Sequence, residues 1–546
     1  MTTAARRGLP RALALAGAVL AVLAASVLPA CSGGSDDPGG APGTSAREAT
    51  AGVGREGGTI RLGLGGPIVV DPERGSPATP TDQMVLDLLH DGLTAVTHEG
   101  QVVAELAQDW SADEAFQTWR FTVDPAATFT SGRPLTASDI VASLEHVIAG
   151  GDASLAALRL EPVQGFRAFL DGTAPNVSGL RAVDESTVQI ALVTPLAILP
   201  ALLAAPAYGI IDLKSVVAAE NGDLSELVLS GGWQVAEAEA DRLLLRRRAG
   251  AVGHLDGIEL RAYPDVTRAY ASFEDGDVDW APIPSNQFGA AVKAYGEDHL
   301  TPFQAELDLG LRVDGPVLSN VGFRRAIAAA IDRDAIVRAV YPDLADPLSA
   351  MVPSGVVGHS PVRCTTCAHD PEHARALVAE VFPDGLVPEL SIDFDASPAQ
   401  QAMAEVVADS LTAVGIPTVL HPLPLGEYQR YLVSGGQQIF TFGWIAGDRT
   451  PDAYLAPLFQ STSPDNLVGL RSPDVDYLLG QARATEDPAV AGDAWSHAER
   501  LLLEDAVVVP IAQFRTQVVV SDRVAGFVHA VDGTVDWSAV TLVRDP

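Results

Sequence analysis

A short apolar run with a polar exit, residues 439–454 (IFTFGWIAGDRTPDAY), has residue types that could bind a small ligand. Its aromatic and β-branched residues predict a buried strand, which the glycine and polar residues after it would end. The indole of Trp444 would offer a flat apolar wall, and Gly443 and Gly447 would let the backbone come close to a ligand. Asp448 would supply charge. The same pattern also fits a core strand with an ordinary exit turn, so the residues alone leave both interpretations open.

Positions 369–373 match H-x-x-E-H, a pattern of zinc proteases. That chemistry needs His369 and His373 on one face of one helix. Asp370, however, fits a helix N-cap and Pro371 fits the first helical residue, which would leave His369 outside the helix. We therefore expect no metal here. A zinc-dependent hydrolase that uses His369, Glu372 and His373 is the alternative.

The N-terminal region has the features of an export signal. Residues 1–11 carry three arginines and no acid, and residues 12–28 form a short uncharged apolar run. Cys31 follows small residues at the expected cut, which resembles the bacterial lipobox, where the cysteine receives a lipid and becomes the first mature residue. We expect a leader over residues 1–30 and a lipid on Cys31. An ordinary secretory signal with a chance cysteine is the alternative.

Composition bounds the rest of the chain. Residues 31–56 are rich in Gly, Ser, Pro and Ala and predict a flexible tether, while the remainder is long enough for about three or four domain-sized units. The sequence has 70 acidic and 35 basic residues, a formal net charge of −35. This charge argues against nucleic acid or an anionic membrane surface as a direct partner, and it permits a cationic ligand. We expect contact with the membrane only through the lipid.

Cys364 and Cys367 form a C-x-x-C pair. In an exported protein a disulfide is the default interpretation of such a pair. The nearby histidines at 369 and 373 leave a small zinc site as the alternative. We expect the disulfide.

Residues 190–211 carry no charge and are long enough to span a bilayer. Pro195, Pro200 and Pro206 interrupt the run at short intervals, and three helix breakers argue against a spanning helix. The segment instead predicts a buried strand followed by short helical turns.

Residues 92–148 carry the pattern of a known family. They combine a G-L pair, an L-A-x-x-W segment, an alternating strand T-W-x-F-x-V and a helix start P-L-T-A-S-D with the spacing of a capping box. This stretch resembles the peptide-type solute-binding proteins of ATP-driven (ABC) importers, a group that includes dipeptide, oligopeptide and nickel binders. The matching positions are Gly92, Leu93, Gly100, Leu106, Ala107, Trp110, Thr118, Trp119, Phe121, Phe129, Gly132, Pro134, Leu135, Thr136, Ala137 and Asp139.

The resemblance continues along nearly the whole expected mature chain. Residues 271–279 look like the family's L-x-x-G-x-V-D turn, residues 321–341 look like its V-R-x-A-I-x-x-A-I-D-R helix, and residues 439–454 look like its G-W segment. Residues 370–381 are similar to its D-P-x-x-A-x-x-L-L helix, with Ala374 and Leu377 matching.

The resemblance implies an α/β fold of the periplasmic-binding-protein type (class II). Two lobes would be joined by two crossing segments, with the ligand enclosed between them and an extra subdomain in the first lobe. We expect lobe I at residues 57–310 and 506–546, and lobe II at residues 311–505.

The implied function is that of a lipid-anchored binding protein on the extracytoplasmic face of the cell membrane. It would be a monomer without a cofactor or enzymatic activity. It would capture peptides or a related small solute between the lobes and deliver it to the membrane subunits of an ABC importer. A binding or sensing protein of the same fold that is not coupled to transport is the alternative.

One family feature is displaced in this sequence. In peptide binders of the family, an acid after G-W holds the ammonium group of the ligand, because an unpaired buried charge costs several kcal/mol. Aligned on Gly443, Trp444 and Pro451, that position holds Gly447, and Asp448 comes one residue later. Either the loop shifts so that Asp448 serves as the anchor, or the anchor is absent and the ligand is not a peptide with a free α-amine.

Overall fold

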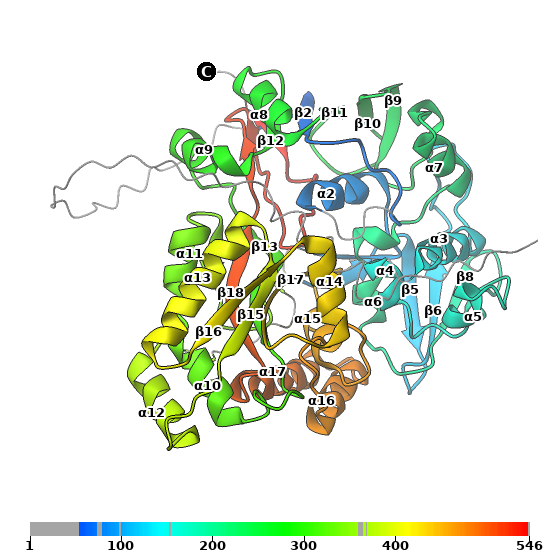
Figure 1. The fold of residues 1–546 in the computed structure, drawn as a ribbon. Helices are drawn as coiled ribbons and strands as arrows, with labels where there is room; N and C mark the ends of the chain where they lie inside the picture. The colour runs from blue at the N-terminus through cyan, green and yellow to red at the C-terminus, as the bar shows by residue number, and fades with distance from the viewer. Residues whose placement is uncertain are drawn as a thin grey trace, which may run out of the picture.

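Two lobes, each built around a six-stranded sheet, form the body of this protein in a computed structural model (Figure 1). The structure describes residues 54–73, 79–97, 100–151, 154–356, 358, 364–366 and 368–543. The expected leader, the lipid site Cys31 and nearly all of the tether lie outside the described residues, as does Cys367. The two-lobe α/β fold expected from the sequence is confirmed.

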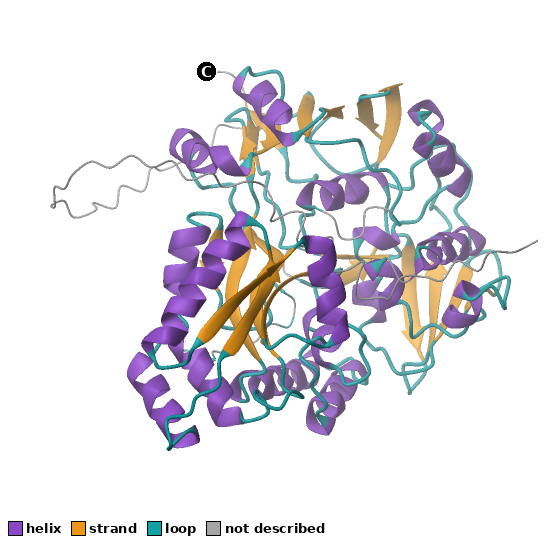
Figure 2. Cartoon of the chain, in the orientation of Figure 1, coloured by secondary structure: helices purple, strands orange, loops and turns teal. Residues whose placement is uncertain are grey.

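The lobe II sheet has the strand order β14-β18-β13-β17-β15-β16. Its strands are β13 (Pro302–Leu311), β14 (Ala345–Pro347), β15 (Leu390–Asp395), β16 (Thr418–Leu423), β17 (Ile439–Ile445) and β18 (Val508–Arg515). Helices cover both faces of this sheet (Figure 2), as buried central strands require. One face packs on α10 (Val321–Ala330), α11 (Arg333–Val340), α12 (Pro371–Val381) and α13 (Pro398–Ala413). The other packs on α14 (Leu425–Ser434), α15 (Asp452–Phe459), α16 (Pro473–Arg483) and α17 (Pro488–Glu504).

The lobe I sheet has the strand order β19-β12-β2-β11-β10-β9. Its strands are β2 (Thr59–Leu64), β9 (Trp233–Glu239), β10 (Arg242–Arg247), β11 (Gly257–Ala262), β12 (Trp280–Pro282) and β19 (Val518–Val520). The helical elements of this lobe are α2 (Pro80–Leu89), α7 (Leu213–Glu220), η3 (Leu224–Glu226), α8 (Val266–Glu274), η4 (Ser285–Gln287) and α9 (Phe288–Tyr295). A small sheet of β1 (Gly54–Arg55), β21 (Thr541–Val543) and β20 (Val524–Ala525) joins the first described residues to the last.

The expected subdomain of lobe I has its own core around Trp119 and Phe121, which are fully buried on β6. Its sheet is β5 (Ala107–Ala112), β6 (Thr118–Val123), β8 (Thr187–Ala191) and β7 (Leu180–Ala182), and its hairpin is β3 (Thr94–Val96) with β4 (Val102–Ala104). Its helical elements are α3 (Ala137–Ala149), α4 (Leu155–Arg159), α5 (Phe166–Leu170), α6 (Leu199–Leu202) and η2 (Pro206–Tyr208). The uncharged segment 190–211 therefore forms a strand end and short helical turns, as expected. Within the described ranges, no helix is both long and apolar enough to span a bilayer.

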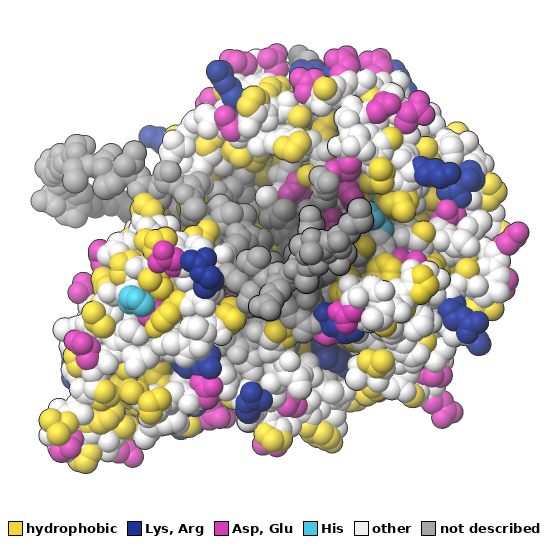
Figure 3. Space-filling model, turned by 45° about the vertical axis from the view of Figure 1, so that its right-hand side comes forward, with side chains coloured by type: hydrophobic (Ala, Val, Ile, Leu, Met, Phe, Trp, Pro, Cys, Tyr) yellow, Lys and Arg dark blue, Asp and Glu magenta, His cyan; other side chains and the backbone are white. Residues whose placement is uncertain are grey.

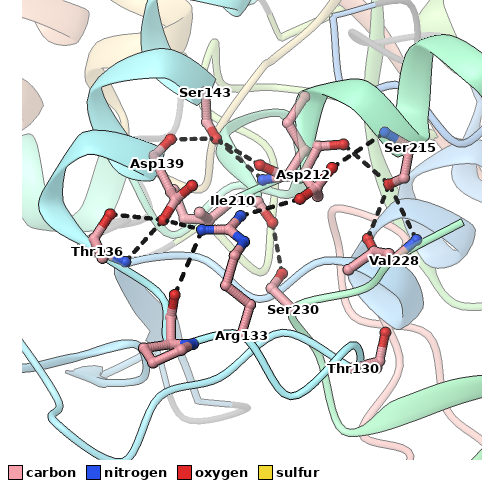
Figure 4. A network of polar contacts seen from close by, with 12 residues as sticks. Thr130, Arg133, Thr136, Asp139, Ser143, Ile210, Asp212, Ser215, Val228 and Ser230 are labelled. Carbon is pink, nitrogen blue, oxygen red and sulfur yellow. Dashed lines mark hydrogen bonds and ion pairs between the residues drawn. The ribbon is translucent and has the colours of Figure 1, made fainter.

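A polar network fixes the start of α3 against α7 (Figure 4). The capping box predicted at the helix start is confirmed, because the Asp139 carboxylate accepts the Thr136 backbone N–H at 2.9 Å. Arg133 donates to Asp139 at 2.9 Å and to Asp212, the N-cap residue of α7, at 3.0 Å. One guanidinium thus joins two helix N-termini within lobe I.

Two details of the fold differ from the sequence-based expectation. All of β13 and β18 lie in the lobe II sheet, so the chain crosses between lobes before Pro302 and after Arg515, not at residues 310 and 505. An apolar run predicts a buried strand but does not say which sheet it joins. Residues 321–341 form two helices and not one, because the Asp332 side chain accepts the Ala335 N–H at 2.8 Å and starts α11.

Candidate functional site

A cavity lies between the lobes, where the loop after β17 faces α2, the β3–β4 hairpin and α6 of lobe I. Its volume, measured as the space open to a water-sized molecule, is about 50 Å³, and the cavity is partly open to solvent. Its described lining residues are Gln83, Asp87, His90, Gly92, Ala95, Val96, Glu105, Ala201, Ala204, Ala205, Pro206, Gln304, Gly447, Asp448, Arg449, Asp532 and Thr534. In Figure 3, acidic side chains lie over both halves of the visible face and in the hollow between them.

The strand predicted at residues 439–444 is confirmed as β17, and its end positions the loop of the cavity. Gly447 and Asp448 line the cavity, whereas Gly443 and Trp444 are not among its described lining residues. The Trp444 side chain packs in the lobe II core, 5 % exposed, and its Nε1–H donates to the Ala453 carbonyl at 2.8 Å. The indole ties the strand to α15 and so fixes where the loop begins.

Asp448 is held in a buried ion network that joins the lobes. Its Oδ2 accepts from Arg159 of α4, at 3.0 Å from Nε and 2.7 Å from Nη2, and its Oδ1 accepts the Thr450 N–H at 2.9 Å. Arg159 also donates to Asp452 at 2.8 Å, and Arg483 donates to the same carboxylate at 2.6 and 2.9 Å. Although burial alone would raise it, the pKa of Asp452 is lowered to about 2 by Arg483 and Arg159.

A second ion pair crosses the cavity beside the first. Arg449 of the β17 loop donates to both oxygens of Asp532 at 2.6 and 2.7 Å, and also to the Thr534 hydroxyl at 2.8 Å. Both charged groups are almost fully buried. Such a two-point contact between a guanidinium and a carboxylate is strong and directional, so it helps to set the position of the loop against lobe I.

Carboxyl groups of lobe I form the opposite wall. Asp87 on α2 is half-buried, and its pKa is raised to about 8, first by burial and then by the carboxylates of Asp532 and Asp91, with Arg449 opposing. Glu105 is exposed at the edge of the cleft, yet desolvation by the surrounding protein raises the pKa of its carboxyl, and Asp91 and Asp87 raise it further. The Gly92 N–H donates to Glu105 at 2.7 Å and opposes this shift. Desolvation comes first and the like charges crowded in the cleft come second, and together they account for both directions.

Sequence patterns indicated residues on only one side of this site. Gly447 and Asp448 were predicted, whereas Asp87, Glu105 and Arg449 were missed. A signal for Asp87 existed: it is an acid within an otherwise apolar helical run. Glu105 stands at a variable position of the family pattern, so the pattern could not indicate it.

The H-x-x-E-H segment does not have the geometry of a zinc site. As expected, α12 begins at Pro371 with Asp370 as its N-cap, whose carboxylate accepts the His373 N–H at 2.9 Å. His369 therefore precedes the helix and cannot share one of its faces with His373. Within the described residues, no group of three or more possible ligands is placed to hold a metal ion.

The expected disulfide is described at one end only. The structure has Cys364 in a disulfide bond, and Cys367 lies outside the described residues. The pairing of the two stays a prediction.

Comparison with known proteins supports the class of protein that the two lobes and the cavity define. The model of bacterial extracellular solute-binding proteins, family 5 (middle region), matches residues 101–466. The chain is 25 % identical over 472 residues to the dipeptide-binding protein of Escherichia coli K12, covering 78 % of this chain and 84 % of that protein. It is 24 % identical over 467 residues to the probable deoxycholate-binding periplasmic protein YgiS of the same organism, covering 82 % and 86 %.

Solved structures agree on the fold. The unliganded open form of the periplasmic murein tripeptide-binding protein MppA superposes with a TM-score of 0.79 at 20 % identity, covering 91 % of this chain and 99 % of that one. Burkholderia pseudomallei OppA superposes with a TM-score of 0.64 at 21 % identity, covering 90 % and 99 %. The chain belongs to family 5 of the bacterial extracellular solute-binding proteins, as the sequence pattern indicated.

Proposed function

We propose that this protein captures a peptide or a related small solute in the cavity between its lobes and delivers it to an ABC importer. The cavity carries this proposal, because residues of both lobes line it and a ligand there would touch α2 and the β17 loop together. Binding proteins with two lobes close around the ligand by hinge motion. The names of the relatives support a small solute, and they span ligands as different as a dipeptide and deoxycholate.

The proposed location is the extracytoplasmic face of the cell membrane, with the lipid on Cys31 as the attachment. The leader pattern at residues 1–30 and the polar composition of residues 31–56 support this arrangement. The membrane subunits of the importer would be the partners. Genes for such subunits beside the gene of this protein would support transport, and their absence would favour a binding or sensing role.

A thermal-shift screen of dipeptides, longer peptides and nickel complexes tests the proposed ligand class. A ligand that binds only the folded state raises its melting temperature. We expect at least one peptide to do so, and we expect Ala204→Trp, which places a large side chain on the cavity wall, to abolish the shift. Ala126→Trp, at an exposed position of the subdomain, is the matched control and should leave the shift unchanged. Shifts only with nickel complexes, or none, would contradict the peptide class.

A further inference from the structure

The charges that line the cavity do not cancel. Five charged side chains are among its described lining residues: Asp87, Glu105, Asp448, Arg449 and Asp532. Two of the four carboxylates have arginine partners, since Asp448 binds Arg159 and Asp532 binds Arg449. Asp87 and Glu105 form no ion pair with a cationic side chain among the described residues.

Two residues of the cavity lining, Gln304 and His90, each have a buried hydrogen-bond acceptor that lacks a donor among the described residues. Gln304 is 2 % exposed, and its Nε2 donates to the Ala446 carbonyl at 2.6 Å, which fixes its Oε1 as the free end. That Oε1 has no hydrogen-bond partner among the described residues. An unpaired buried acceptor is unfavourable, so a donor in the cavity would restore a favourable contact.

His90, on lobe I, also has a buried acceptor atom without a hydrogen-bond partner among the described residues. It is 2 % exposed, and its Nε2 lies 2.9 Å from the Val70 carbonyl, an atom that can only accept. The ring therefore carries its proton on Nε2, and its Nδ1 is an acceptor without a partner within the described part of the chain. Burial lowers the pKa of His90 to about 4, against the opposing effects of Val70 and Asp71, so the ring is neutral at pH 7.

We infer that the cavity binds a cationic nitrogen group of the solute, a protonated amine or a guanidinium, against Asp87 and Glu105, with Gln304 and His90 as further acceptors. The inference rests on the proposed function and specifies its ligand. A charged N–H group would favour the ionised forms of Asp87 and Glu105, which burial and crowding disfavour in the empty cavity, and would supply the donors that the two buried acceptors lack. An anionic solute would find no unpaired cation among the described lining residues, because Arg449 is paired with Asp532. The two acids that would recognise the cation therefore lie on lobe I, whereas Asp448 on the loop is neutralised by Arg159.

Matched probes test this inference. The tripeptides Ala-Lys-Ala and Ala-norleucine-Ala, both N-acetylated, differ by one ammonium group, and agmatine and cadaverine are cations without a peptide bond. Titration calorimetry should show that the lysine peptide binds roughly 10- to 100-fold more tightly than the norleucine peptide, the range for one charged hydrogen-bonded contact. Asp87→Asn combined with Glu105→Gln should remove this preference. Asp109→Asn combined with Glu114→Gln, at exposed positions outside the cavity, should keep it.

The outcomes separate this inference from the proposed function. If both peptides bind equally, or if the preference survives in the Asp87/Glu105 variant, the cation site is contradicted and peptide capture stands. If only agmatine or cadaverine binds, and only with Asp87 and Glu105 intact, the cation site stands and the peptide class is wrong. If no probe binds the native protein, both are contradicted. The melting temperature of the Asp87/Glu105 variant should not fall, because removing two crowded carboxylates relieves repulsion, so lost binding would not reflect unfolding.

Discussion

Arg159 and Asp448 lie 289 positions apart in the chain and meet in a buried ion pair, with 2.7 Å between Nη2 and Oδ2. The arginine comes from the subdomain of lobe I and the aspartate from the loop of lobe II, so this pair joins the two walls of the cleft. It also changes the interpretation of Asp448: the carboxylate lines the cavity, but its charge is already balanced.

The first prediction concerns this pair. Arg159→Met should lower the free energy of unfolding by about 3–5 kcal/mol, because it leaves Asp448 and Asp452 buried without their shared cation. Arg120→Met, at an exposed position of β6, should change it by less than about 1 kcal/mol. Urea denaturation of the three proteins measures both values. Equal effects of the two substitutions would show that the pair does not stabilise the fold.

The second prediction concerns pH. Glu306 and Asp308 on β13 are fully buried, and no carboxyl oxygen of either has a hydrogen-bond partner among the described residues. Burial raises the pKa of both groups, and the pKa of Glu306 is raised further by Asp308 and Glu499. The folded state therefore keeps protons that the unfolded state loses above about pH 4.

The contribution of these two groups to the free energy of unfolding should therefore be fully present below about pH 4. It should fall as the pH rises through neutrality, by up to about 1.4 kcal/mol per pH unit for each proton retained. Glu306→Gln combined with Asp308→Asn should flatten this slope, and Glu380→Gln, at an exposed site on α12, should not. Urea denaturation at several pH values measures the slope. An unchanged slope in the double variant would mean that these carboxyls do not titrate as their burial implies.

The third prediction concerns Cys364 and Cys367. Denatured but unreduced protein should contain no free thiol from this pair, and Cys367→Ser should expose one. The short loop predicts a contribution of about 2 kcal/mol to stability, which reduction should remove. Two reactive thiols in the native sequence, or stoichiometric zinc, would support the metal alternative instead.

The fourth prediction concerns membrane attachment. Cys31→Ala should leave the leader uncleaved or release the protein into the medium, because the lipid supplies the affinity for the membrane. Cell fractionation, with mass spectrometry of the N-terminus, measures both outcomes. A variant that loses residues 1–30 and still sediments with the membrane would contradict the lipid anchor.

Local sequence patterns predicted the elements of this fold well. The strand at β17, the N-cap of α12 and the capping box of α3 each depend on residues within one turn or one strand, and all three are confirmed. The membership of β13 in the lobe II sheet could not be predicted, because it depends on pairing with β17 and β18 far away in the chain.

The same limit applies to the site. The sequence indicated Asp448 as a charge near a ligand, but not that Arg159 would neutralise it. Glu105 is unremarkable in its own segment, and both Asp87 and Glu105 gain importance because the fold places them in one cavity where no described cationic side chain pairs with them. Long-range pairing of charges decides which acids are free, and a single sequence does not contain that information locally.

Capture of one solute in the cavity between the lobes is measured by calorimetric titration of a peptide hit into the native protein and into Ala204→Trp. We expect one ligand per protein molecule in the native chain and in Ala126→Trp, and no measurable binding to Ala204→Trp. Binding that persists in Ala204→Trp with unchanged affinity would place the ligand elsewhere and rule out capture in this cavity.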